Sequence, residues 1–151
     1  MDINIRYAAP SDAVIIAEFN ARMAKETENL ELDRELLRRG TEALLADLPK
    51  GMYYLAETGG TVIGQLMITY EWSDWRNATF WWIQSVFVLP EYRMHGVFRK
   101  LYHHIESLAR TRGDVCGLRL YVDISNKLAQ QTYKALGMDH SHYQMMEMDI
   151  P

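Results

Sequence analysis

Residues 81–110 read WWIQSVFVLPEYRMHGVFRKLYHHIESLAR, and this stretch decides the fold. Its first part, residues 83–88, is an apolar run rich in β-branched and aromatic side chains, which predicts a buried strand. Pro90 ends the strand because proline has no N–H to donate to a ladder. From Val97 onward the apolar residues recur at helical spacing, so we expect a long helix after a short turn that contains Gly96.

The turn before this helix is suited to an anion. The first amides of a helix have no partner inside the helix, and they lie at the positive end of its dipole. Gly96 allows the backbone to approach a ligand closely, and Arg93 and Arg99 place positive charge beside it. We therefore expect an anion such as pyrophosphate to bind at this turn. The alternative for Arg93 is a loop cation that is simply solvated.

This arrangement resembles the acetyl-CoA signature of the GNAT superfamily of N-acetyltransferases, which is Gln/Arg-x-x-Gly-x-Gly/Ala after a strand ending in Val-x-Pro. Arg93 and Gly96 match the signature, and so do Val88 and Pro90 before them. Phe98 departs from it, because the family usually has a small residue there. Either the helix starts slightly further from the phosphates, or the Phe98 ring turns into the core. The resemblance implies that acetyl-CoA is bound by the residues of the strand end and the turn: Val86, Phe87, Val88, Arg93, Met94, His95, Gly96, Val97 and Phe98.

A second pattern lies near the C-terminal end, where Asn126, Ala129 and Tyr133 share one side of a short predicted helix. Together with Gly137 they resemble a GNAT motif at fixed spacing. The resemblance implies that Tyr133 is the acid that protonates the leaving thiolate and that Asn126 contacts the pantetheine arm. The alternatives are a core-packing tyrosine and a helix cap, and Asn126 can serve as both cap and ligand.

Composition narrows the class of protein. A chain of 151 residues with 48% hydrophobic residues is long enough for one domain with a sizeable core, and we take residues 1–151 as a single domain. The net charge of −4 argues against nucleic acid as a partner. A single cysteine excludes an internal disulfide and favours a reducing compartment. No signal-peptide pattern and no membrane-length apolar run are visible, so we expect a cytoplasmic protein without a membrane partner.

The periodicity along the chain predicts the order β-α-α-β-β-β-α-β-α-β, which is also the GNAT order. A strand, helix, strand passage in the middle implies a parallel pair, and hairpins imply antiparallel pairs elsewhere. We therefore expect an α/β fold with a mixed, mostly antiparallel, twisted sheet of six to seven strands flanked by about four helices. The predicted strands include 118–122 and a last strand at 143–148, and residues 71–77 are expected to form a polar loop.

The general base is harder to place. Many GNAT enzymes carry a Glu on the central strand to deprotonate the amine, but neither face of the strand at 81–88 has a carboxylate. The candidates lie in predicted loops, namely Glu26, Glu28, Glu71 and Asp74, and Glu71 is the first choice as the catalytic base. Loss of the proton through a water chain is the alternative.

Aromatic and acidic side chains together suit an amine or a cation. We therefore assign four residues to the acceptor site: Glu26, Trp72, Asp74 and Trp75. Trp81 and Trp82 are expected to pack in the core. The histidines and Cys116 show no ligand spacing, so we expect no metal.

The leading hypothesis is an acetyl-CoA-dependent N-acetyltransferase that transfers the acetyl group directly to a primary amine in a ternary complex. A thioester carbonyl needs a fixed donor for its developing charge, and by resemblance the Val88 amide supplies it. The acceptor is a small-molecule or peptide amine, and a homodimer is compatible with the exposed aromatics. A non-catalytic acyl-CoA-binding or regulatory module is the alternative. A dinucleotide-binding domain is disfavoured because the Gly-x-Gly-x-x-Gly fingerprint is absent.

Overall fold

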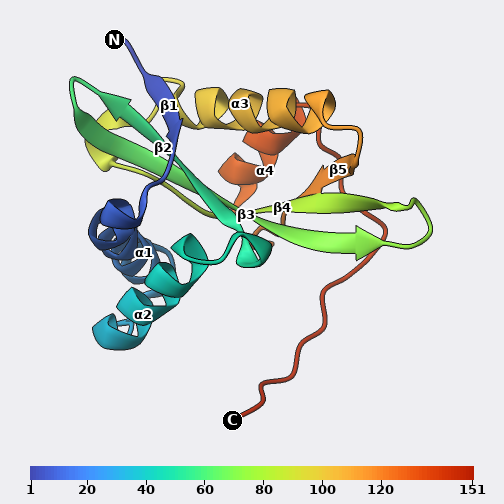
Figure 1. Ribbon diagram of the computed structural model, residues 1–151, viewed down its shortest axis with the longest axis horizontal. Helices are drawn as coiled ribbons and strands as arrows, with labels where there is room; N and C mark the ends of the chain where they lie inside the picture. Colours follow the sequence, from blue (N-terminus) through green and yellow to red (C-terminus); the bar gives the residue numbers. More distant parts are fainter. The chain divides into compact units, whose positions relative to one another are not determined.

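The backbone divides into two units, Met1–Leu120 and Tyr121–Pro151, and the computed structural model describes every residue, 1–151 (Figure 1). A single domain over residues 1–151 stays a prediction. The strands are β1 (Asn4–Tyr7), β2 (Met52–Thr58), β3 (Thr61–Ser73), β4 (Ala78–Val88) and β5 (Val115–Arg119). The helices are α1 (Ala13–Glu28), α2 (Arg34–Leu45), α3 (Val97–Thr111) and α4 (Lys127–Ala135).

The five strands form one sheet in the order β1-β2-β3-β4-β5. The first three pairs are antiparallel, and β4 pairs with β5 in parallel. The predicted mixed, mostly antiparallel sheet with four helices is thus confirmed, and so is the parallel pair around the strand–turn–helix stretch. Strand β5 begins three residues earlier than its predicted counterpart, and Cys116 lies inside it, half-buried.

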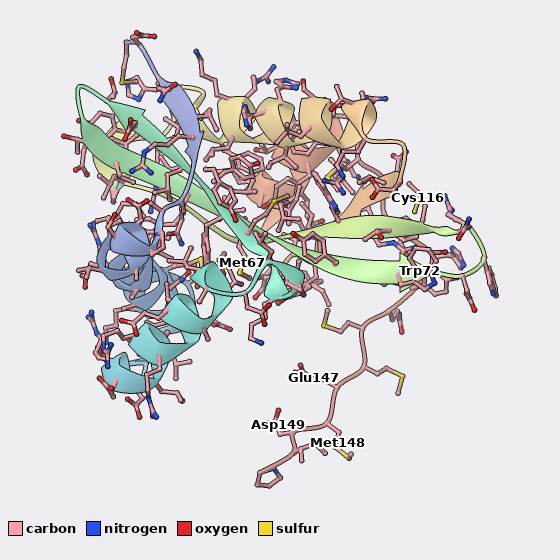
Figure 2. All side chains as sticks on the ribbon, in the orientation of Figure 1. Met67, Trp72, Cys116, Glu147, Met148 and Asp149 are labelled. Atoms are coloured by element: carbon pink, nitrogen blue, oxygen red, sulfur yellow. The ribbon has the colours of Figure 1, made fainter.

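The predicted strand at 143–148 is wrong, so the sheet has five strands instead of six to seven. This stretch pairs with no strand, and its three methionines are exposed, as seen along the extended end of the chain around Met148 (Figure 2). Apolar residues at strand spacing are not sufficient for a strand, because each backbone N–H and C=O also needs a partner in a neighbouring ladder.

Helices cover both faces of the sheet in the first unit. The Gln65 side chain of β3 donates a hydrogen bond to Asn20 of α1. The preceding residue, Gly64, lies against Val97 of α3. Because successive strand residues point to opposite faces, α1 and α3 must pack on opposite sides of β3, as Figure 1 shows. The fully buried side chains come from these helices and the strands between them: Ile16, Phe19, Leu55, Ile63, Leu66, Ile68, Leu101 and Ile105.

The strand β4 is longer than its partner β5, and this difference leaves part of the β4 edge without a paired strand. Strand β5 pairs with β4 only between Thr79 and Trp82, whereas β4 continues to Val88. The edge of β4 beyond Trp82, on the side away from β3, therefore has no neighbouring strand. This gap lies in the stretch that precedes the predicted anion-binding turn.

A bulge interrupts the pairing of β3 with β4 in the same region. Gln65 pairs with Phe87, but Met67 pairs with Gln84, so β4 has one extra residue between these two pairs. Ser85 absorbs the irregularity with a φ of 52°, in the left-handed region that non-glycine residues seldom adopt. The bulge bends β4 just before the residues that we expect to hold acetyl-CoA.

The predicted loop at 71–77 is mostly strand. Strand β3 runs to Ser73 and β4 begins at Ala78, with Glu71 opposite Phe80 and Trp72 opposite Thr79. The polar side chains of this stretch did not prevent pairing, because they alternate with apolar ones along a solvent-facing hairpin.

The second unit contains α4, and both of its ends are capped as expected. The Asn126 side chain accepts a hydrogen bond from the Ala129 N–H at 3.1 Å, so Asn126 is the N-cap. At the other end Gly137 has a φ of 99°, and the Met138 N–H donates to the Tyr133 carbonyl. This is a Schellman ending, in which glycine takes the left-handed position. No helix in either unit has the length and apolarity that crossing a bilayer requires.

Candidate functional site

The open edge of β4 presents backbone groups from alternate residues. The Leu89 N–H donates to the Ile63 carbonyl of β3 at 2.9 Å, so the backbone groups of Val88 point to the opposite edge. In agreement, the Val88 carbonyl accepts from Arg93 Nε at 2.9 Å. Val86, two residues earlier, faces the same edge, whereas the Phe87 backbone faces β3. Of the three β4 residues expected to bind acetyl-CoA, only Val86 and Val88 direct backbone groups to the gap, and the Val88 carbonyl there is bonded to Arg93.

The turn that follows β4 has the backbone shape expected of an anion site. Met94 and Gly96 have φ values of 65° and 78°, and no side chain caps the start of α3. The first amides of α3 are therefore not occupied by a cap. His95 bonds through Nδ1 to the Arg93 carbonyl at 2.8 Å, which holds the turn closed on itself.

Arg93 and Glu26, expected in different sites, form an ion pair. The two terminal nitrogens of Arg93 lie 2.5 and 3.0 Å from the two Glu26 oxygens. The hydrogen bonds from Arg93 lower the pKa of the Glu26 carboxyl. With Nε already bound to the Val88 carbonyl, all three guanidinium nitrogens are engaged, so an anion that recruits Arg93 has to compete with Glu26.

A second cation lies close to Arg93 on the same ring. The guanidinium carbons of Arg22 and Arg93 are each 5.5 Å from the centre of the Phe87 ring. Phe87 is buried, and its ring packs against Phe19 with centroids 5.0 Å apart. The position of Arg22 at this ring was not predicted from the sequence, since nothing along the chain relates Arg22 to β4.

Phe98 does not turn fully into the core. Its ring is half-buried and lies 6.2 Å from the ring of Tyr102, one turn further along α3. The residue that anchors the start of the helix is Val97, which is 2% exposed and lies against Gly64. The large side chain at position 98 is thus accommodated along the helix.

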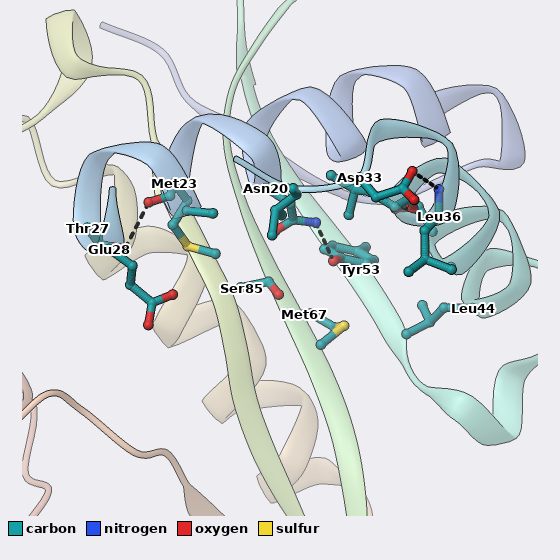
Figure 3. A pocket seen from close by; sticks show the side chains of 15 residues that line it. Asn20, Met23, Thr27, Glu28, Asp33, Leu36, Leu44, Tyr53, Met67 and Ser85 are labelled. Carbon is teal, nitrogen blue, oxygen red and sulfur yellow. Dashed lines mark hydrogen bonds between the residues drawn. The ribbon is translucent and has the colours of Figure 1, made fainter. Parts of the chain in front are cut away.

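Two pockets flank the bulge in β4. The smaller pocket, of about 250 Å³, is lined by Met23, Glu26, Thr27, Val86, Phe87, Val88 and Arg93. The larger pocket, of about 530 Å³, lies between α1, α2 and the sheet. Its lining residues are Asn20, Met23, Ala24, Thr27, Glu28, Leu32, Asp33, Leu36, Leu37, Gly40, Thr41, Leu44, Tyr53, Met67 and Ser85 (Figure 3).

The two pockets adjoin, because Met23 and Thr27 line both of them. On the β4 side, Ser85 lines the larger pocket and the next residue, Val86, lines the smaller one. The bulge therefore separates two sites that share a wall. A group bound along Val86 and Val88 would meet a group bound in the larger pocket near Met23 and Thr27.

A buried polar network holds the bulge in place. Gln65 Nε2 donates to Asn20 Oδ1 and to the Ser85 carbonyl, both at 3.1 Å. Asn20 Nδ2 in turn donates to the Tyr53 hydroxyl at 3.0 Å, and Ser85 is a further hydrogen-bond partner of that hydroxyl. Burial raises the pKa of Tyr53. Gln65 is completely buried, and its Oε1 has no partner.

Several residues predicted for the site lie elsewhere. Trp72, Asp74 and Trp75 line neither pocket, and Trp75 at the end of the β3–β4 hairpin is 91% exposed (Trp72 is labelled in Figure 2). Glu71 also lines neither pocket; it accepts hydrogen bonds from the Trp82 indole at 2.8 Å and from Arg119 at 2.9 Å. These bonds lower the pKa of Glu71, which makes it a weaker base than an ordinary glutamate.

The second unit carries the two remaining predicted residues, Asn126 at the N-cap of α4 and Tyr133 within α4. The Tyr133 side chain is half-buried, and burial raises the pKa of its hydroxyl. The hydroxyl is therefore protonated at neutral pH, as an acid must be before the reaction. No cluster of three or more His, Cys, Asp or Glu side chains that could hold a metal ion is found in the chain.

The polar floor of the larger pocket was not predicted from the sequence. Asn20, Tyr53 and Ser85 line it, and the buried Gln65 bonds to Asn20 and Ser85. These four residues come from α1, β2, β3 and β4, and no spacing links them. The one available signal was the polar residues within otherwise apolar strands, such as Gln65 between Gly64 and Leu66. A buried polar side chain in a strand usually has partners, but only the fold shows which.

The comparisons with known proteins agree with this geometry. Residues 17–138 match the model of the acetyltransferase (GNAT) family. The chain is similar to the crystal structure of a possible acetyltransferase from Clostridium difficile 630, with 44% sequence identity and a TM-score of 0.93, over 99% of this chain and 98% of that one. A predicted acetyltransferase with acetyl-CoA from Clostridium acetobutylicum has the same fold, with a TM-score of 0.79 at 19% identity over 98% and 96% of the two chains.

A curated relative adds a named activity. Thialysine N-epsilon-acetyltransferase from Bos taurus is 34% identical over 80 residues, which are 52% of this chain and 45% of the bovine protein. The matched part is thus less than half of that relative. The family match, by contrast, extends from α1 through α4 and includes the β4–turn–α3 stretch. The chain therefore belongs to the acetyltransferase (GNAT) family, a family of N-acetyltransferase enzymes.

Proposed function

We propose that this enzyme transfers the acetyl group of acetyl-CoA directly to a primary amine bound in the larger pocket. The observation that carries the proposal is the shared wall between the two pockets, at Met23 and Thr27. A thioester lying along the open edge of β4 and an amine in the larger pocket would approach each other there. Both substrates can thus be present together, as direct transfer requires.

The residues around the smaller pocket fit coenzyme A. The Val86 backbone groups, which face the gap, can pair with a pantetheine amide in the manner of an added strand, and the Val88 N–H faces the same gap. The uncapped start of α3 and the turn with left-handed Met94 and Gly96 offer amides to the pyrophosphate. Arg93 adds positive charge beside this turn. Val97 supports the helix start from the core, and His95 holds the turn.

Acetyl-CoA supplies an activated acyl group with a thiolate as the leaving group. The amine nitrogen forms a bond to the carbonyl carbon, and the Val88 N–H, which faces the gap, stabilises the oxyanion. When the carbon–sulfur bond breaks, the sulfur keeps the electron pair and the Tyr133 hydroxyl donates a proton to it. The Tyr133 hydroxyl is protonated at neutral pH, as a proton donor in this step has to be. Before the attack the ammonium loses one proton to solvent or to a carboxylate. After the attack the nitrogen loses a second proton, which reprotonates the Tyr133 oxygen through solvent, so the products are the neutral amide and the free thiol.

Glu28 is a better candidate than Glu71 for that carboxylate. Glu28 lines the larger pocket, next to Thr27 in the shared wall. Glu71 lines neither pocket, and its hydrogen bonds lower its pKa. The name of the bovine relative, an N-epsilon-acetyltransferase, supports a primary amine as the kind of group acetylated.

A non-catalytic acyl-CoA-binding module is the second candidate, and two observations favour it. The central strand β4 has no carboxylate, and Glu26 occupies the terminal nitrogens of Arg93. Such a module would bind acetyl-CoA without releasing CoA in the presence of any amine. A cytoplasmic location and a homodimer stay predictions from the sequence.

The test is a screen for amine-dependent release of CoA from acetyl-CoA, with binding of acetyl-CoA measured separately by calorimetry. We expect binding, turnover with at least one class of primary amine, and a strong loss of turnover in Tyr133→Phe. Tyr143→Phe, which changes an exposed tyrosine of the same unit, is the control and should behave like the wild type. Absence of acetyl-CoA binding would refute the proposal, and binding without turnover would favour the non-catalytic module.

A further inference from the structure

The larger pocket is lined mainly by apolar side chains. Its walls are mostly apolar, and they come from α1, α2 and the sheet: Met23, Leu32, Leu36, Leu37, Leu44 and Met67. Its volume of about 530 Å³ is within the range of pockets that enclose small molecules. The polar lining residues are Asn20, Tyr53 and Ser85 at the floor, two threonines, and the two acidic residues discussed next (Figure 3).

Glu28 and Asp33 are the charged residues that line this pocket; no lysine, arginine or histidine does. Asp33 caps α2 by accepting the Leu36 N–H at 3.1 Å, and it has no cationic partner. Glu28 makes neither an ion pair nor a side-chain hydrogen bond. Its acidic neighbours differ, since Glu26 pairs with Arg93 and Glu31 pairs with Lys25. Glu28 thus lines the pocket without an ion pair, whereas the carboxylates of Glu26 and Glu31 are each paired with a cation.

Charge is divided between the two pockets. Arg22 and Arg93 both lie over the Phe87 ring beside the smaller pocket, where a polyanionic donor would bind, and the Glu26 carboxylate of that pocket is paired with Arg93. The larger pocket carries only negative charge. This division favours an anion on one side of the bulge and a cation on the other.

Glu28 lies at the end of the pocket where transfer would occur. It follows Thr27, which belongs to the shared wall. Figure 3 shows Glu28 and Thr27 at one end of the pocket and Leu44 at the other. An amine that pairs with Glu28 would direct its remaining atoms toward the apolar end near Leu44.

We propose that the larger pocket selects a primary amine on an apolar body that carries no carboxylate, and that Glu28 binds its ammonium group. This inference rests on the proposed function. An ammonium group beside Glu28 gains a charge-assisted hydrogen bond. A carboxylate on the same molecule would leave water without a cationic partner, and it would be repelled by Glu28 and Asp33. Amino acids should therefore be poorer acceptors than the amines that remain after their carboxylate is removed.

Matched acceptor pairs test the selection. We would measure kcat/KM by CoA release for tyramine against tyrosine and for cadaverine against lysine. We expect the amine without a carboxylate to be preferred at least 10-fold in the pair that reacts. Equal rates, or a preference for the amino acid, would overturn the inference.

Substitutions at Glu28 test the residue. Glu28→Gln should raise the KM of the amine about 10-fold and leave the KM of acetyl-CoA unchanged, and Glu28→Arg should reverse the preference within the pair. The control is Glu31→Gln, because Glu31 lies three residues away, is exposed and does not line the pocket. Unchanged amine KM in Glu28→Gln would refute the role of this residue.

Two binding measurements separate the outcomes. If the protein does not bind acetyl-CoA in calorimetry, the proposed function fails. If it binds acetyl-CoA but neither tyramine nor cadaverine binds or reacts, the proposed function stands and this inference is refuted. Thermal unfolding of each variant checks that the fold is intact.

Discussion

Replacing Gln65 by leucine tests whether the buried network holds the bulge in β4. The substitution keeps the size of the side chain roughly the same but removes both donated hydrogen bonds, to Asn20 Oδ1 and to the Ser85 carbonyl. Each buried acceptor left without a partner costs about 1–3 kcal/mol. Leucine also removes the unpartnered Gln65 Oε1, so the variant no longer carries the similar penalty of that one buried acceptor. The free energy of unfolding should therefore fall by about 1–3 kcal/mol.

Activity should fall further than stability explains. The Ser85 carbonyl bonded by Gln65 belongs to the residue with a φ of 52°, so Gln65→Leu frees the bulge to relax. Val86 and Val88 follow the bulge, so their backbone groups should shift relative to the thioester. We expect kcat/KM to drop at least 10-fold under conditions where the variant is still folded.

Urea unfolding and thermal melting measure the first effect. A loss of about 2 kcal/mol corresponds to a fall in Tm of about 4–8 °C for a chain of this size. Gln131→Leu, the same substitution at an exposed position of α4, is the control and should change stability by less than about 0.5 kcal/mol. If Gln65→Leu unfolds at the same urea concentration as the wild type and retains full activity, the network does not hold the bulge.

Further predictions concern Tyr133, Glu26 and Glu71. Tyr133→Phe should lower kcat about 100-fold with little change in the KM of acetyl-CoA; equal turnover in a steady-state assay would remove Tyr133 from the acid role. Glu26→Gln should release the terminal nitrogens of Arg93 and tighten acetyl-CoA binding several-fold in calorimetry, whereas weaker binding would show that the pair is needed as it stands. Because Arg93 lowers the pKa of Glu26, the pair stabilises the fold above the ordinary pKa of about 4.3, and that contribution is lost as the pH falls through the lowered value. Glu71→Gln should leave the pH profile of kcat/KM unchanged between pH 6 and 9, since Glu71 lines neither pocket; loss of the acidic limb would identify it as the base after all.

Local sequence was sufficient to predict most of the helices and strands, and the turn at which we expect an anion to bind. The switch from strand spacing at 83–88 to helical spacing after Val97, with Pro90 and Gly96 between them, depends on neighbours in the chain, and the structure has the same strand, turn and helix. The caps of α4 at Asn126 and Gly137 follow from the same kind of local rule. There are two exceptions: the segment 143–148 pairs with no strand, and the predicted loop at 71–77 is mostly strand.

Tertiary structure alone decided where the larger pocket lies, in which we propose that the amine binds, and which charges remain unpaired. Glu26, Glu28 and Glu71 look alike in the sequence, but the fold pairs the first with Arg93 and the last with Arg119, and it leaves Glu28 unpaired in the larger pocket. The bulge at Ser85 likewise depends on Gln65, which lies twenty residues away on another strand. The physical reason is that hydrogen bonds and ion pairs form between atoms close in space, whereas periodicity and capping report only residues close along the chain.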